Sequence, residues 1–175
     1  MPEAVPVDTL IEQNRIVYTS DGIFNEGDYT RMVQNRITKG VATGLGREAT
    51  GIRVGRPGGR LPVGTEIRRN AVECLDVGIS LAAVDSLITQ NLVAKNREYG
   101  VTVSGPYNVI EANRIMDTVG ENAVAGLIIS SVGNLIIRNA LDGNWPFDLI
   151  VENPAENDLV ENRCKRSSPP HLCGR

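Results

Sequence analysis

The sequence predicts an all-β chain wound as a right-handed parallel β-helix, and three observations support this prediction. β-Branched residues dominate the apolar set of the 175-residue chain, with 19 Val and 15 Ile against 13 Leu, and such residues favour strands. The 18 Gly and 15 Asn residues provide for many tight corners. A short motif also recurs along the chain at intervals that leave no room for a helix of ordinary length.

The recurrent motif is an apolar residue, two free positions, Asn, one free position and a small or apolar residue. Its first copies are IEQNRI from Ile11 and MVQNRI from Met32, and later copies follow at steps of 21 to 26 residues, with one longer step of 35. If every copy occupies the same point of a coil, the amides stack about 4.8 Å apart and hydrogen-bond to one another. Asn also tolerates the left-handed backbone that a tight corner requires. We therefore predict a structural asparagine ladder made of Asn14, Asn35, Asn70, Asn91, Asn113, Asn139 and Asn162.

A second element alternates with the first and consists of Gly followed by an inward, outward, inward triplet. Copies include GIRV from Gly51 and GVTV from Gly100, and the last copy has Asp148 in place of Gly. Each repeat therefore contains at least two short strands. A leucine-rich horseshoe has a similar period but requires a Leu-dominated consensus, which this chain lacks. We expect a lead-in over residues 1–9, about six to seven coils over residues 10–163, and a C-terminal cap over residues 164–175.

Over residues 10–163 these two motifs resemble the superfamily of right-handed parallel β-helix repeat proteins, whose fold is described as pectin lyase-like. The superfamily includes pectate and alginate lyases, mannuronan epimerases, polygalacturonase-like hydrolases and phage tailspikes. The resemblance implies secreted or envelope-associated work on glycans. Its members usually have a signal peptide and an N-terminal cap, whereas this chain reaches its first motif at residue 11 with neither. We therefore expect a C-terminal portion of a longer protein, or an open first coil that packs on another subunit.

The 35-residue step between Asn35 and Asn70 contains two insertions, at residues 38–50 and 55–64. Insertions are where solenoids commonly carry function. Residues 39–69 hold seven basic and two acidic side chains, a local charge of +5 in a chain of net charge −3. Because guanidinium groups suit carboxylates and sulfates, we predict an anion-binding surface. The alternatives are a solvated basic loop, or pairing with acidic residues elsewhere on the solenoid. The predicted contact residues are Arg47, Arg53, Arg56, Arg60, Arg68 and Arg69.

Two weaker signals also concern ions. Arg15 and Arg36 occupy the same motif position in successive coils, where like charges are unfavourable unless an anion or a neighbour compensates. Asp117 and Glu121, in a Gly-containing loop, are carboxylates of the kind that bind calcium. Calcium is a minor alternative to our expectation of no metal and no cofactor.

Composition argues against several other classes of protein. The net charge of −3 makes nucleic-acid binding an unfavourable interpretation. No apolar run approaches the ~20 residues that span a bilayer. One His and three Cys leave little for a His/Cys metal cage, and His171 lies in a Ser/Pro tail unsuited to a catalytic triad. Lys95, Tyr99 and Arg114 suit a lyase site by residue type alone, so the question of catalysis stays open.

The cysteines divide into a single residue and a pair. Cys74 directly follows a copy of the Asn motif and is expected in the core or at a corner. Cys164 and Cys173 lie on either side of the tail segment KRSSPPHL, and a disulfide between them would close a loop across the last coil. Such a bond implies an oxidising compartment.

Three hypotheses about function follow. The first is an extracellular or envelope β-helix domain that binds acidic polysaccharide, or another polyanion, through the Arg-rich coil. The second is a polysaccharide lyase or epimerase acting on uronates. The third is a structural module that associates end to end through its first coil.

Overall fold

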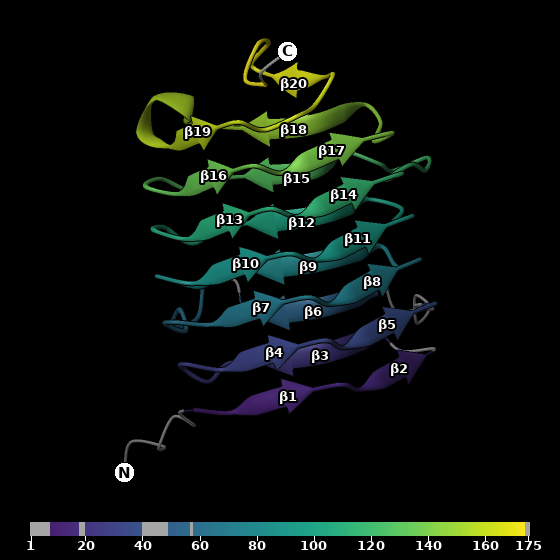
Figure 1. The fold of residues 1–175 in the computed structure, drawn as a ribbon, viewed down its shortest axis with the longest axis vertical. Helices are drawn as coiled ribbons and strands as arrows, with labels where there is room; N and C mark the ends of the chain where they lie inside the picture. Colours follow the sequence, from purple (N-terminus) through teal and green to yellow (C-terminus); the bar gives the residue numbers. More distant parts are fainter. Residues whose placement is uncertain (1–7, 18–19, 40–48, 57, 174–175) are drawn as a thin grey trace.

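The computed structural model describes residues 8–17, 20–39, 49–56 and 58–173, and these form a right-handed parallel β-helix. Coils of the chain stack from the N-terminus at the bottom of Figure 1 to the C-terminus at the top. Each of the first six coils contributes one short strand to each of three parallel sheets, which we call sheets A, B and C, and the last coil contributes to sheets A and C. The all-β solenoid predicted from the repeats is confirmed.

The three sheets contain seven, six and seven strands. Sheet A consists of β1 (Leu10–Glu12), β4 (Arg31–Val33), β7 (Glu66–Arg68), β10 (Leu87–Thr89), β13 (Val109–Glu111), β16 (Leu135–Ile137) and β19 (Asp158–Val160). Sheet B consists of β2 (Arg15–Val17), β5 (Arg36–Thr38), β8 (Ala71–Glu73), β11 (Leu92–Ala94), β14 (Arg114–Met116) and β17 (Ala140–Asp142). Sheet C consists of β3 (Asp21–Asn25), β6 (Thr50–Val54), β9 (Val77–Leu81), β12 (Tyr99–Val103), β15 (Ala125–Ile129), β18 (Phe147–Val151) and β20 (Ser167–Ser168). A short 3-10 helix, η1 (Pro154–Glu156), precedes β19.

Apolar side chains stack in register along the axis of the solenoid. In sheet A, Ile67, Ile88 and Ile110 align on neighbouring strands, and all three are fully buried. Three-residue strands suffice because only the middle residue faces inward. Burial of each such side chain contributes ~1.5–3 kcal/mol, so a continuous apolar column stabilises the coils.

The corner between sheets A and B bends at a single residue with positive φ. This residue precedes the ladder Asn in every coil, as at Gln34 (φ 55°), Gln90 (φ 56°) and Ala112 (φ 52°). We expected the Asn itself to take the left-handed conformation, and the structure corrects that assignment. The preceding residue makes the turn, which leaves the Asn side chain directed into the corner.

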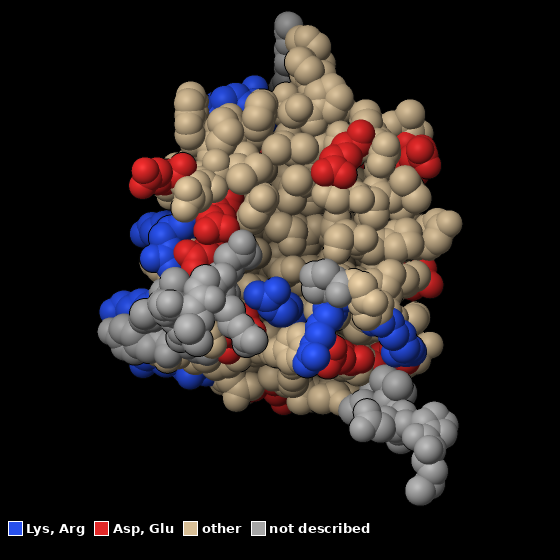
Figure 2. Space-filling view, turned by 180° about the vertical axis from the view of Figure 1, so that it is seen from behind, with Lys and Arg blue, Asp and Glu red and all other residues tan. Residues whose placement is uncertain are grey.

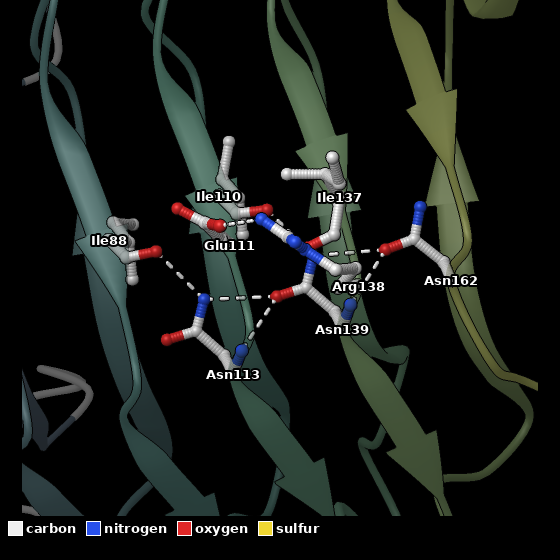
Figure 3. A network of polar contacts seen from close by, with 8 residues as sticks. All are labelled: Ile88, Ile110, Glu111, Asn113, Ile137, Arg138, Asn139 and Asn162. Carbon is white, nitrogen blue, oxygen red and sulfur yellow. Dashed lines mark hydrogen bonds and ion pairs between the residues drawn. The ribbon is translucent and has the colours of Figure 1, made fainter.

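The asparagine ladder predicted from the motif is confirmed (Figure 3). Asn113 donates from both its backbone N and its Nδ2 to Oδ1 of Asn139, each at 3.0 Å, and Asn139 does the same to Asn162. The second Nδ2 hydrogen of Asn113 reaches the carbonyl oxygen of Ile88, 2.8 Å away in the preceding coil. These central amides are buried and fully hydrogen-bonded, so the ladder satisfies polar groups that would otherwise be costly to bury.

A second ladder occupies the corner that precedes sheet A, and sequence analysis missed it. Ser86 donates its backbone N to Oδ1 of Asn108, Asn108 to Asn134, and Asn134 to Asn157, at 2.9 Å in each case. Thr65 begins this run with a bond to the Ser86 hydroxyl at 3.0 Å. Because the position holds Thr, Ser and Asn in turn, no single residue type marks it in the sequence.

The C-terminal segment closes the last coil. Asp148 replaces the recurrent Gly and is fully buried, and its Oδ2 accepts the backbone N–H groups of Lys165 at 3.0 Å and Arg166 at 3.1 Å. Cys164 and Cys173 are joined in a disulfide, with their Cα atoms 5.5 Å apart. Cys74, in contrast, is a free and exposed cysteine at a corner with φ of 62°.

Candidate functional site

The first part of the Arg-rich coil lies on sheet C. Arg53 points outward from β6, as the inward positions of Ile52 and Val54 require. Its Nη2 donates to the Thr50 hydroxyl at 2.6 Å and lies 3.4 Å from Oδ1 of Asp21 on the neighbouring strand. The Arg53 guanidinium is therefore already engaged within the protein.

Two further arginines of this coil pair with acidic residues of the loop after β3. Arg56 places Nε 2.8 Å from Oε1 of Glu26. Arg60 binds both carboxylate oxygens of Asp28, with one contact at 2.9 Å, and Asp28 also accepts the backbone N–H of Val63. The hydrogen bond from Arg60 holds the pKa of the Asp28 carboxyl below its usual value, against the opposing effect of burial.

The remaining arginines predicted for this surface are also partnered. Nε of Arg68 lies 3.1 Å from Oε1 of Glu66, and Nε of Arg69 donates to Oε1 of Gln90 at 2.9 Å. Arg47 lies outside the described residues. Figure 2 shows the result, with basic and acidic side chains mixed over the lower coils and a largely uncharged face above them. An external anion would have to compete with these intramolecular partners.

The outward face of sheet B carries a different set of arginines. The residue after each ladder Asn points outward there, and in register along the axis this row reads Arg15, Arg36, Ala71, Leu92, Arg114, Ala140 and Arg163. Within the described part of the chain, Arg15, Arg114 and Arg163 have no ion pair and no side-chain hydrogen bond. The recurrent dipeptide Asn-Arg was the sequence signal for this row, and we interpreted it only at Arg15 and Arg36.

Each end of the sheet B face is hollowed. A cavity of about 550 Å³ near the N-terminal end is lined by Arg15, Arg36, Thr38, Lys39, Glu73 and Cys74. Here Arg36 lies 3.7 Å from Glu73, which compensates part of the stacked positive charge. A second cavity of about 550 Å³, near the C-terminal end, is lined by Arg114, Ala140, Leu141, Asp142, Arg163, Cys164 and Lys165.

The residues considered for a lyase site lie on three different elements. Tyr99 lies on β12 of sheet C, Lys95 at the corner after β11, and Arg114 on β14 of sheet B. A nearby charged pair, Arg97 and Asp76, forms a cross-coil ion pair at 2.6 Å. The charged side chains of this pair therefore link two neighbouring coils at a corner.

Comparison with known proteins shows the family. A family model described as "Periplasmic copper-binding protein (NosD)" matches residues 6–167. The chain belongs to the NosD family. No curated protein and no solved structure matches it significantly. The periplasmic description supports a location in the cell envelope, and in the part of the chain that the structure describes no helix is long and apolar enough to cross a membrane.

The family description of NosD as copper-binding prompts a test of the metal donors. Copper sites use thiolate, thioether and imidazole ligands. Among the described residues of this NosD-family chain, Cys164 and Cys173 are joined in a disulfide, and Met32 is fully buried in the core. Met116 on β14, Cys74 at the corner after β8 and His171 in the C-terminal segment lie on separate elements. These donors come from different elements, so the residues that the structure describes do not fit a copper site.

Calcium is not supported by a donor cluster either. Asp117 takes a left-handed corner position after β14, and Glu121 is exposed in the following loop. Across the described ranges, no group of three His, Cys, Asp or Glu side chains is arranged to hold a metal ion.

Proposed function

We propose that this NosD-family chain is a periplasmic binding module that takes up an acidic polysaccharide along the outward face of sheet B. The observation that carries the proposal is the row of arginines that follow the ladder asparagines. Three of them, Arg15, Arg114 and Arg163, make no ion pair and no side-chain hydrogen bond among the described residues. Arg36 pairs with Glu73 at 3.7 Å, with 66% of its side chain exposed.

The geometry of a solenoid suits a linear ligand. From Arg15 to Arg163 the row crosses six strand-to-strand steps of ~4.8 Å, a length of roughly 29 Å along the axis. A repeating polyanion lying along this axis can meet guanidinium groups at both ends, and guanidinium groups bind carboxylates and sulfates in a bidentate manner. The proposal therefore keeps the acidic ligand expected for the Arg-rich coil and moves the contact surface to sheet B.

The test compares two surfaces of the same chain. Binding of polygalacturonate, a heparin-like glycan and neutral dextran would be measured by titration calorimetry at several salt concentrations. We expect salt-sensitive binding of an acidic glycan only, weakened at least tenfold by the triple variant Arg15→Gln, Arg114→Gln and Arg163→Gln.

The matched control is a triple change in the Arg-rich coil, at Arg53, Arg56 and Arg60. This control should bind as the parent chain does, although loss of its ion pairs lowers thermal stability. Loss of binding in the control with retention in the sheet B variant would move the contact surface to the Arg-rich coil. Equal binding of dextran, or no binding of any acidic glycan, would overturn the proposal.

A further inference from the structure

The cavity at the C-terminal end of sheet B exists because this sheet ends one strand before its neighbours. Sheets A and C each contain seven strands, whereas sheet B contains six. In the last coil, the segment after β19 pairs with β17 only through an isolated bridge, between Ala140 and Arg163. The chain then continues to β20 of sheet C. The small Ala140 side chain and the departing segment leave a hollow of about 550 Å³ beside β17.

The charged groups around this hollow differ in whether they form an ion pair. Lys165 places Nζ 2.8 Å from Oδ1 of Asp142. This contact holds the pKa of the Asp142 carboxyl below its usual value and raises the pKa of the Lys165 ammonium, so both stay charged near neutral pH. Three cations and one anion therefore line the hollow, a local charge of +2. The charge of Arg114 acts on Asp142 from a distance, but neither Arg114 nor Arg163 makes an ion pair or a side-chain hydrogen bond among the described residues.

We infer that this hollow is a subsite for one oxyanion group of an acidic sugar, a carboxylate or a sulfate, held between Arg114 and Arg163 above Ala140. The inference deepens the proposed function and rests on it for the identity of the carrier. The two arginines flank Ala140 in register, Arg114 on the neighbouring strand β14 and Arg163 at the isolated bridge on the other side. Their separation of two strand spacings, ~9.6 Å, leaves room for an anion that both long side chains reach.

The row of outward residues on sheet B also provides a control substitution for this subsite. Leu92 stands at the position that Ala140 occupies two coils later, so a Leu is compatible with the outward face of sheet B. Leu in place of Ala140 would occupy the floor of the hollow without altering any charge. Ala71 occupies the same row and does not line this hollow, so Ala71→Leu adds the same side chain elsewhere on the sheet.

The experiment uses small probes in place of the polymer. Digalacturonate, N-acetylglucosamine 6-sulfate and uncharged N-acetylglucosamine would be titrated into the full chain, with affinity measured by calorimetry and the fold by thermal melting. We expect a carboxylated or sulfated probe to bind, with affinity reduced at least tenfold by Ala140→Leu and by less than twofold by Ala71→Leu. Arg114→Gln and Arg163→Gln should each weaken binding about fivefold or more.

The outcomes separate this subsite from the proposed function. Binding of a charged probe that survives both Ala140→Leu and Arg163→Gln overturns the subsite. Failure of every charged probe, with the polymer still bound, overturns the subsite and leaves the proposed function standing. Binding of a small probe without binding of any polymer supports the subsite and rejects the polymer as ligand. Preference between digalacturonate and the sulfated sugar identifies the oxyanion.

Discussion

Replacing Asn91 by Leu should destabilise the solenoid far more than the same change at Asn14. Asn91 lies in the middle of the ladder, where its Oδ1 accepts the backbone N–H of Asn70 at 2.9 Å. Its Nδ2 donates to the carbonyl oxygen of Ile67 at 2.9 Å and to Oδ1 of Asn113 at the same distance. The Asn91→Leu change removes all of these bonds inside a buried corner.

The magnitude follows from the groups left without partners. The backbone N–H of Asn70 and the carbonyl of Ile67 lose the acceptor and donor that Asn91 provides. Each buried group left unsatisfied costs ~1–3 kcal/mol, so we expect a loss of ~2–6 kcal/mol in the free energy of unfolding. Asn14 belongs to the first coil, and no described donor uses its Oδ1. Asn14→Leu should therefore cost less than ~1 kcal/mol.

The assay is equilibrium urea unfolding of the two variants and the parent chain, followed by far-ultraviolet circular dichroism. Both variants carry the same Asn→Leu change, so the pair isolates position in the ladder from the size of the side chain. In a solenoid, each coil depends on its neighbours, and a central defect affects interfaces on both sides. Equal losses of stability at Asn91 and Asn14 would refute the account of the ladder given above.

Three further predictions concern other parts of the molecule. Gly100→Ala should lower the melting temperature strongly, because an added Cβ would lie 2.4 Å from the carbonyl oxygen of Gly126; an unchanged melting curve would contradict this packing. Cys164→Ser should destabilise the chain by ~2–3 kcal/mol through loss of the loop constraint, and reductant should reproduce the loss in the parent chain but not in the variant. The ion pair with Arg60 lowers the pKa of Asp28, so its stabilising contribution is complete above the unfolded pKa and is lost as pH falls through the folded value. Asp28→Asn should therefore flatten the acid side of the stability profile, and an identical profile in variant and parent would show that the pair contributes nothing.

Much of the fold was accessible from the sequence because solenoid structure is periodic along the chain. A buried amide at one point of every coil must recur as Asn, which made the ladder visible from Asn14 to Asn162. The second ladder was not visible because the acceptor at this corner is a hydroxyl in Ser86 and an amide in Asn108. A position that requires a hydrogen-bond acceptor, but no particular side-chain shape, is not occupied by the same residue type in every coil.

The sequence by itself therefore determined the coil, its repeat and its inward face, while only the tertiary structure decided which charges meet. The surplus of arginines between residues 39 and 69 predicted a free basic surface, yet Arg53 and Arg60 find acids 32 residues earlier in the chain. With a constant 21-residue repeat, the residues that lie side by side on neighbouring coils could be read from the sequence. The long insertions of this coil break that spacing. Sheet B likewise acquires its hollow only where the last coil departs from β17. Lateral contacts depend on how coils of unequal length stack, and that is a property of the folded chain.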